Sequence, residues 1–166
     1  WYDGGDYWGV AVLDKSKTQY PPVLSTIGNK PVTDLTALFA NCSNLTTPPV
    51  LSTNTTNLFL TFAHCTNLET APIIPQSTTV LEHTFSNCHS LTTAPIIPEN
   101  VEIISGAFYN CTNLVGTIEI NANLDLEFYE ELAYECALYG TQITEVIGST
   151  PYKTEILETK NQEFPM

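Results

Sequence analysis

The sequence predicts an α/β solenoid, a stack of 23-residue units with one short strand and one short helix per unit and capped ends. Three observations support this prediction: a cysteine that returns once in every unit, apolar residues at fixed offsets from it, and a Thr- and Ile-rich segment in each unit. An apolar set with this spacing cannot be buried within one unit, whereas stacking the units buries it in a continuous column.

The repeat is visible in four segments that align without gaps. They are FANCSNLTTPPVL (39–51), FAHCTNLETAPIIP (62–75), FSNCHSLTTAPIIP (85–98) and FYNCTNLVGTIEI (108–120). Taking each cysteine as position 0, apolar residues recur at +3, +16 and +20. The cysteines are Cys42, Cys65, Cys88 and Cys111, and the recurring apolar residues are Leu45, Leu68, Leu91 and Leu114, then Leu58, Leu81 and Ile104, then Phe62, Phe85 and Phe108.

Each unit contains one segment that suits a strand and one that suits a helix. The segment from +3 to about +9 is rich in Thr and Ile and ends at Pro75 or Pro98, which is typical of a short strand. The segment from +14 to +22 has apolar residues at i and i+4, such as Leu81 and Phe85, which indicates one or two helical turns. One strand and one short helix per unit describe a leucine-rich repeat.

The chain divides into three predicted regions. Residues 20–147 hold the leucine-rich repeats, and residues 1–19 form an N-terminal cap or the end of a preceding region. Residues 148–166 form a C-terminal cap or tail. A terminal unit has to cover the open end of the core with polar surface, so capped ends are expected.

The last predicted unit is degenerate. Cys136 begins this unit and lies slightly further from Cys111 than the repeat period allows. Residues 125–139 predict a longer helix, with Asp125 as its N-cap and Gly140 as its C-cap. A strand-like tail is expected at residues 152–157.

Composition limits the classes of function. The net charge is −13, from 18 acidic and five basic residues, so a polyanion is repelled and nucleic acid is not an expected partner. Residues 99–166 carry twelve of the acids and two of the bases. No apolar run reaches the roughly 18 residues that a membrane span needs, so no span is expected in this chain.

The cysteines could be metal ligands, nucleophiles, disulfide partners or packed thiols. The nearest two are a full repeat apart, whereas metal sites use closely spaced ligands, and His64 and His89 are merely sequence neighbours of Cys65 and Cys88. Stacked turns lie close enough for disulfides, but the count of five is odd and equivalent side chains point in parallel. We expect free, packed thiols, without metal or cofactor.

Two further motifs have a structural and a functional interpretation. The sequence Asp3-Gly4-Gly5-Asp6, flanked by Trp1 and Trp8, suits a calcium turn or an aromatic sugar platform, but a hairpin or N-terminal cap is preferred, because an EF-hand needs many more oxygen ligands. An acidic run could supply paired catalytic carboxylates, although on a helix it is more often a solvated face. That run consists of Glu127, Glu130, Glu131 and Glu135. No catalytic residue is assigned, and the chain is not expected to be an enzyme.

The motif as a whole resembles a known family. Cys-x-x-Leu, a Pro-terminated strand and Leu-x-x-x-Phe-x-x-Cys are similar to the BspA-type leucine-rich repeats of bacterial and protist surface proteins, over roughly residues 20–147. The pattern departs from the family at Thr61 and Thr84, which stand where Ala usually precedes Phe. The resemblance implies a right-handed leucine-rich repeat solenoid whose strands line a concave surface.

Alternation along the strand predicts which side chains face a partner. In the copy Thr-Ile-Glu-Ile, Ile118 and Ile120 must point inward, so the outward positions are +6 and +8. The predicted ligand-binding residues on the concave face are therefore Pro48, Val50, Ala71, Ile73, Ala94, Ile96, Thr117 and Glu119. A one-residue slip in register would bury this apolar strip and leave a Thr-rich face instead, and both alternatives stay open.

The resemblance also implies a function. It indicates a non-enzymatic, extracellular protein, secreted or held at the cell surface, that binds a host matrix protein or another cell as a monomer. Two alternatives stay open. One is a carbohydrate-binding module that uses the aromatic N-terminus, and the other is a passive structural spacer of a larger surface protein.

Overall fold

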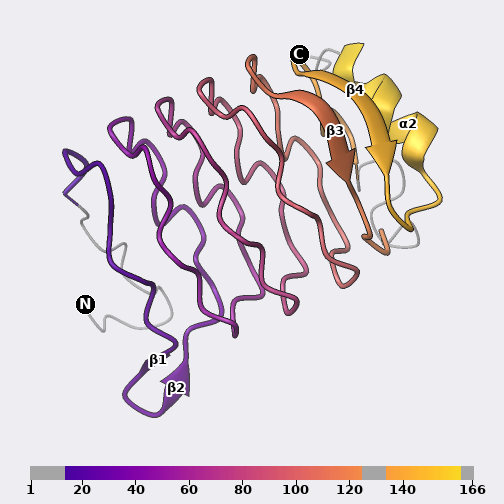
Figure 1. Cartoon of the computed structure of the whole chain (residues 1–166). Helices are drawn as coiled ribbons and strands as arrows, with labels where there is room; N and C mark the ends of the chain where they lie inside the picture. Colours follow the sequence, from indigo (N-terminus) through magenta and orange to yellow (C-terminus); the bar gives the residue numbers. More distant parts are fainter. Residues whose placement is uncertain (1–13, 125–133, 162–166) are drawn as a thin grey trace.

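The computed structural model describes residues 14–124 and 134–161 of the 166-residue chain. They wind into a row of stacked coils that runs from one end of the chain to the other (Figure 1). Strands β1 and β2 form an antiparallel hairpin below the first coils, and β3 and β4 are parallel neighbours. The regular elements are β1 (Thr26–Ile27), β2 (Lys30–Pro31), β3 (Val115–Glu119), β4 (Gln142–Ile147), helix α2 (Lys153–Glu158) and the 3₁₀ turn η2 (Thr159–Asn161).

Neighbouring coils pair in the register that the repeat predicts. Parallel bridges join Thr70 to Thr93 and Ile97 to Ile120, and the members of each pair are one repeat apart in the sequence. A second series of bridges with the same spacing joins Asp34, Asn57, Val80 and Ile103. The repeat period is therefore the distance along the chain from one coil to the equivalent point of the next.

The strands of the first coils are reduced to isolated bridges, and the reason is visible in the sequence. Position +7 is a proline in three coils, Pro49, Pro72 and Pro95, and it becomes Ile118 in the fourth. Proline has no backbone N–H and cannot donate to a ladder. The first regular strand of the stack, β3, begins in the coil where isoleucine replaces proline.

The predicted helix in each unit is wrong. Residues 58–65 form three overlapping tight turns, closed by bonds from the N–H groups of Thr61, Ala63 and Cys65 to the carbonyls of Leu58, Leu60 and Phe62. The third residue of the first and of the last of these turns has a positive φ, which a right-handed helix does not allow. The residues concerned recur from coil to coil: Ala37, Leu60, His83 and Gly106, then Asn41, His64, Asn87 and Asn110.

The same turns also bond to the next coil. The N–H of Leu60 donates to the Glu82 carbonyl at 3.1 Å, and the N–H of Phe62 donates to the Thr84 carbonyl at 2.9 Å. Backbone groups therefore alternate between closing a local turn and joining two coils. This pattern satisfies buried backbone polar groups without a helix.

The core consists of columns of identical side chains. Phe39, Phe62, Phe85 and Phe108 stack with successive ring centroids 5.3, 5.6 and 5.5 Å apart and interplanar angles of 11° or less. Tyr20 closes the N-terminal end of this column, with its ring 5.3 Å from that of Phe39. The leucines at +3 and the cysteines at position 0 form further columns, which are fully buried.

The last coil does not begin where the sequence predicts. The N–H groups of Gly106, Phe108 and Asn110 donate to the carbonyls of Glu135, Ala137 and Tyr139, in the pattern found one coil earlier. This coil is longer than the others, so Cys136 lies opposite Gly106 instead of in the cysteine column. Cys136 and Gly106 both have a positive φ. The helix expected at 125–139 lies partly outside the described residues, and residues 134–139 form turns.

The C-terminal segment covers the last coil. The N–H of Leu138 donates to the Thr159 hydroxyl at 3.1 Å and the N–H of Gly140 to the Lys160 carbonyl at 3.2 Å, so this segment takes the place of a further coil. The strand expected at 152–157 is instead helix α2, which buries Ile156 against the core. Within residues 14–124 and 134–161, no helix combines the length and hydrophobicity needed to cross a bilayer.

Candidate binding face

The outward side chains of the strand segments form the candidate binding face, which we call the strand face. Val50, Ile73 and Ile96 are 68, 91 and 59% exposed, whereas each following residue is buried: Leu51, Ile74 and Ile97. Ile118 and Ile120 are also buried. The chain therefore has the alternation expected at +8 and +9 and not that of the slipped register.

The other predicted residues also lie on this face. Pro48, Ala71 and Ala94 are half-buried. Thr117 is exposed and Glu119 is half-buried. The binding role of these residues stays a prediction.

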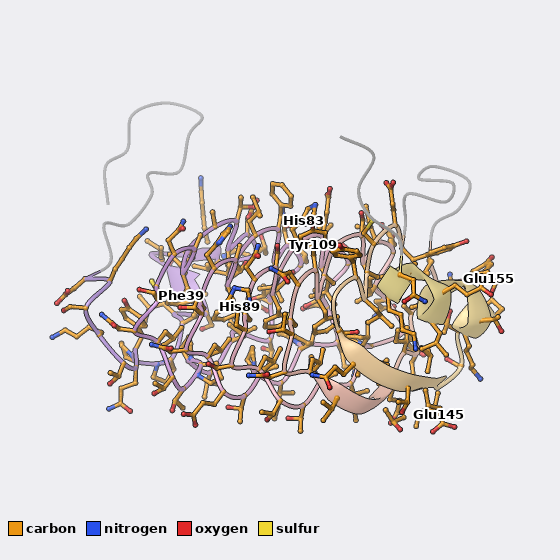
Figure 2. The ribbon with its side chains drawn as sticks, turned by 90° about the horizontal axis from the view of Figure 1, so that it is seen from above. Phe39, His83, His89, Tyr109, Glu145 and Glu155 are labelled. Atoms are coloured by element: carbon orange, nitrogen blue, oxygen red, sulfur yellow. The ribbon has the colours of Figure 1, made fainter. Side chains whose placement is uncertain are left out.

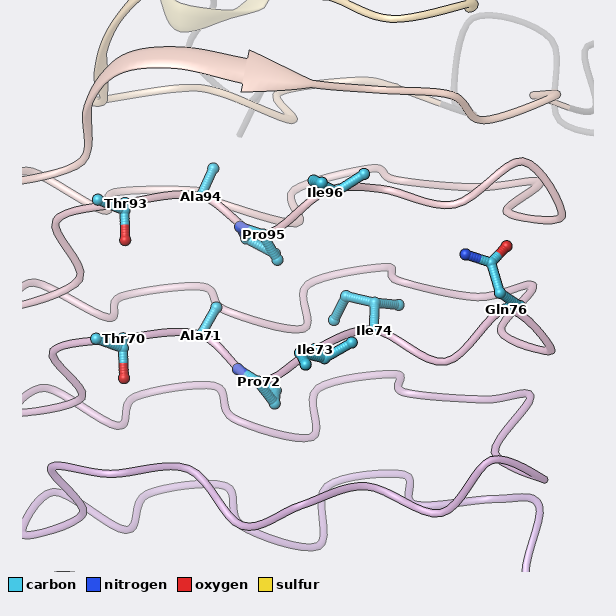
Figure 3. A pocket seen from close by; sticks show the side chains of 10 residues that line it. All are labelled: Thr70, Ala71, Pro72, Ile73, Ile74, Gln76, Thr93, Ala94, Pro95 and Ile96. Carbon is cyan, nitrogen blue, oxygen red and sulfur yellow. The ribbon is translucent and has the colours of Figure 1, made fainter.

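A shallow trough runs between the exposed columns. Figure 3 shows Thr70 and Thr93 on one side of it, Ile73 and Ile96 on the other, and the alanines and prolines between them. We call the half-buried Ala71 and Ala94 its floor and the exposed threonines and isoleucines its walls. Its volume between these two coils is about 300 Å³, and Pro72, Pro95, Ile74 and Gln76 complete its lining. The trough suits aliphatic side chains of a partner, since its walls and floor are mainly methyl and methylene groups.

The strand face becomes acidic toward the C-terminal end. Glu119 accepts a hydrogen bond from the side-chain amide of Asn121 at 3.0 Å. Glu145 of the adjacent strand accepts a hydrogen bond from the Thr117 hydroxyl at 3.2 Å. Both donors are neutral, so the two carboxylates keep their charge available to a partner.

Sequence reasoning missed two further exposed apolar residues near the C-terminal end of this face. Val115 in β3, in the same coil as Thr117, is 48% exposed, and Ile147 in β4, on the last coil, is 40% exposed. Ile147 pairs with Glu119, at an offset longer than the repeat, and the register is irregular after Gly116. A search at the spacing of the repeat cannot find a residue at that offset.

The cysteine thiols lie in the core. All five are buried and none is in a disulfide, and burial raises the pKa of Cys65 and Cys111 to about 12. Buried, protonated thiols are poor nucleophiles and poor metal ligands. Across residues 14–124 and 134–161, no group of three or more His, Cys, Asp or Glu side chains is placed to hold a metal ion.

His83 and His89 pack against neighbouring coils. His83 and Tyr109 lie on the side of the stack opposite to β3 and β4 (Figure 2). The His83 ring packs against Gly106, and burial lowers its pKa. The Nδ1 atom of His89 is 3.0 Å from the Asn110 carbonyl, so it has a structural partner in the next coil.

Two predicted motifs lie wholly or mostly outside the described residues. The N-terminal Asp3–Asp6 turn with Trp1 and Trp8 lies in residues 1–13, and most of the acidic run lies in residues 125–133. Glu135, the last member of that run, is half-buried, and its backbone carbonyl accepts a hydrogen bond from the Ser105 hydroxyl at 3.2 Å. The sugar platform, the calcium turn and the solvated acidic face stay untested.

Comparison with known proteins identifies the class of the fold as the leucine-rich repeat. The model of the BspA type leucine-rich repeat region matches residues 26–115, in 6 copies. This match covers more than half of the chain, which therefore belongs to the BspA-type leucine-rich repeat family.

A solved structure is also similar to this chain. It is the crystal structure of a T. pallidum leucine-rich repeat protein, TpLRR, with 17% sequence identity and a TM-score of 0.43. The similarity covers 89% of this chain and 85% of that chain. No curated protein matches the sequence.

Proposed function

We propose that this chain is a non-enzymatic, extracellular module that binds another protein through its strand face. The observation that carries the proposal is the column of exposed aliphatic side chains formed by Val50, Ile73 and Ile96. Aligned from coil to coil, these side chains expose a contiguous apolar strip to water. Such a strip is typical of a protein-binding surface.

The chemistry of the face supports a protein partner over other classes. The trough is lined by Thr, Ala, Pro and Ile side chains, which suit aliphatic groups better than sugar hydroxyls. The net charge of −13 disfavours nucleic acid. Membership of the BspA-type family supports adhesion to a host matrix protein or to another cell, with the chain secreted or held at the cell surface.

The test is binding of the purified chain to immobilised fibrinogen, fibronectin and mucin glycans. A variant with Ile73→Glu and Ile96→Glu places two charges on the apolar column without touching buried residues. A control variant with Asn67→Glu and Asn113→Glu adds the same charge at exposed turns before the strands. We expect saturable binding to a protein that is retained in the control and lost in the strand-face variant.

Other outcomes contradict the proposal in different ways. Binding that survives in the strand-face variant would place the site elsewhere on the chain. Binding to mucin glycans that depends on Trp1 and Trp8 would favour the carbohydrate-binding module. The absence of binding to all three ligands would favour a passive spacer.

A further inference from the structure

We infer that the partner segment that fills the trough is an amphipathic α-helix, with one aliphatic side chain per turn and Lys or Arg in a terminal turn. This inference rests on the proposed function and specifies its ligand. It follows from the spacing of the coils, from the shape of the trough and from the charge at its C-terminal end.

The spacing of the coils is close to the pitch of a helix. Successive phenylalanine rings in the core lie 5.3, 5.6 and 5.5 Å apart, and paired strand segments, as at Thr70 and Thr93, lie about 4.8 Å apart. The pitch of an α-helix is about 5.4 Å, so over three coils a helix along the stack stays within about 1 Å of one side chain per coil. Side chains on one face of an extended strand recur at about 6.7 Å and lose register by about 4 Å within three coils.

The trough offers a place for one side chain per coil. Ala71 and Ala94 have short, half-buried side chains, whereas the larger side chains of Ile73 and Ile96 beside them are exposed. An aliphatic side chain from each turn of the helix can lie over an alanine and contact the isoleucine wall. This arrangement resembles knobs packing into holes, in which small residues leave room for the knob.

The negative charge at the C-terminal end of the strand face favours a helix with basic residues at one end. Glu119 and Glu145 lie where the apolar column ends, and within residues 14–124 and 134–161 neither carboxylate forms a salt bridge. A Lys or Arg in the last turn over the stack would pair with them. A second copy of this chain is a poor occupant, because two chains of charge −13 repel each other.

The test uses two synthetic, fluorescein-labelled peptides of equal composition and helicity. The striped peptide carries leucines along one helical face and two lysines in a terminal turn, and the shuffled peptide distributes the leucines around the helix. Fluorescence anisotropy measures their binding to the full chain at low and physiological salt. We expect the striped peptide to bind about tenfold more tightly or better, since its leucines all face the trough.

Two variants locate the peptide. Ala71→Leu with Ala94→Leu fills the floor and should weaken binding about tenfold or more, because it removes the space for the knobs. The matched control is Asn67→Leu with Asn113→Leu, which adds the same side chains outside the strand face. Glu119→Gln with Glu145→Gln should weaken binding about fivefold and reduce its salt dependence. Thermal unfolding of each variant verifies that it folds.

The other results overturn the inference. Equal binding of the two peptides would indicate unspecific attraction, and undiminished binding to the filled-floor variant would place the helix elsewhere. The striped peptide could fail to bind while a matrix ligand binds the chain but not the Ile73→Glu and Ile96→Glu variant. That result would reject the helix and keep the strand face as the binding site. If neither the striped peptide nor a matrix ligand binds, both the helix and the proposed function are rejected.

Discussion

The thiol of Cys88 donates a hydrogen bond of 3.2 Å to the backbone carbonyl of Phe62 in the preceding coil. The same bond joins Cys65 to Phe39 at 3.1 Å and Cys111 to Phe85 at 3.0 Å. Each thiol therefore fills a place in the core and also bonds to a buried carbonyl of the neighbouring coil. This double role explains why a small residue with a weak donor recurs at the position.

We predict that Cys88→Ala lowers the free energy of unfolding by about 2 kcal/mol, because it leaves a small cavity and removes a hydrogen bond from a buried carbonyl. Urea denaturation followed by circular dichroism measures the change. The exposed Ser43→Ala is the control and should alter stability by less than about 0.5 kcal/mol. A loss below that level for Cys88→Ala would mean that the thiol bond contributes little.

We predict that stability falls in alkaline solution. Burial raises the pKa of Cys65 and Cys111 from 9.0 to about 12, so between these pH values the unfolded thiols lose protons that the folded thiols keep. The stabilisation is fully present below pH 9 and is lost as the pH rises toward 12, at about 1.4 kcal/mol per pH unit for each thiol. Urea denaturation at pH 8, 9, 10 and 10.5 measures the slope.

The variant Cys111→Ala supplies the control for this pH dependence. It removes one of the titrating thiols, so its slope should be shallower by about 1.4 kcal/mol per pH unit above pH 9. An unchanged slope would attribute the alkaline loss of stability to other groups.

We predict opposite consequences for two adjacent isoleucines. Ile74 is 4% exposed and Ile73 is 91% exposed. Ile74→Ala should therefore lower the free energy of unfolding by about 2–4 kcal/mol, whereas Ile73→Ala should change it by less than about 0.5 kcal/mol. Chemical denaturation of both variants decides the matter, and Ile96→Ala with Ile97→Ala repeats the comparison one coil later. The reverse order in either pair would indicate the slipped register.

The repeat, the core and the strand alternation can be predicted from the sequence because each is strictly periodic. The constant spacing of the cysteines determines which side chains stack, and the Thr-Ile-Glu-Ile copy determines which of them point inward. The predicted helix is wrong because Leu81 and Phe85, at positions i and i+4, suit a run of overlapping tight turns as well as a helix. Asparagine or glycine at Asn41, Asn87 and Gly106 is a signal for those turns, since both residues tolerate a positive φ.

The last coil cannot be predicted because its length departs from the repeat. Cys136 has the residue type of the cysteine column, and alignment by residue type therefore assigns it to that column. Its hydrogen-bonding neighbours place it instead at the turn position of Gly106. The outward residues of β4 escape prediction for the same reason, because they pair with β3 at offsets longer than the repeat.

Two buried threonines provide a final pair of opposite predictions. Among the described residues, the Thr55 hydroxyl is buried without a hydrogen-bond partner, whereas the Thr84 hydroxyl donates to the Leu58 carbonyl at 2.8 Å. Valine already occupies the position of Thr55 in other coils, at Val32 and Val101, so the site accepts an apolar side chain of this shape.

Thr55→Val should raise the free energy of unfolding by about 0.5–1 kcal/mol, because it removes an unsatisfied polar group and conserves volume. Thr84→Val should lower it by about 1–2 kcal/mol, because the Leu58 carbonyl loses one of its two donors and keeps only the bond from the N–H of Thr61. Urea denaturation of the two variants measures both changes. An equal loss of stability in the two variants would show that the Thr55 hydroxyl is also bonded, with a buried water as the simplest partner.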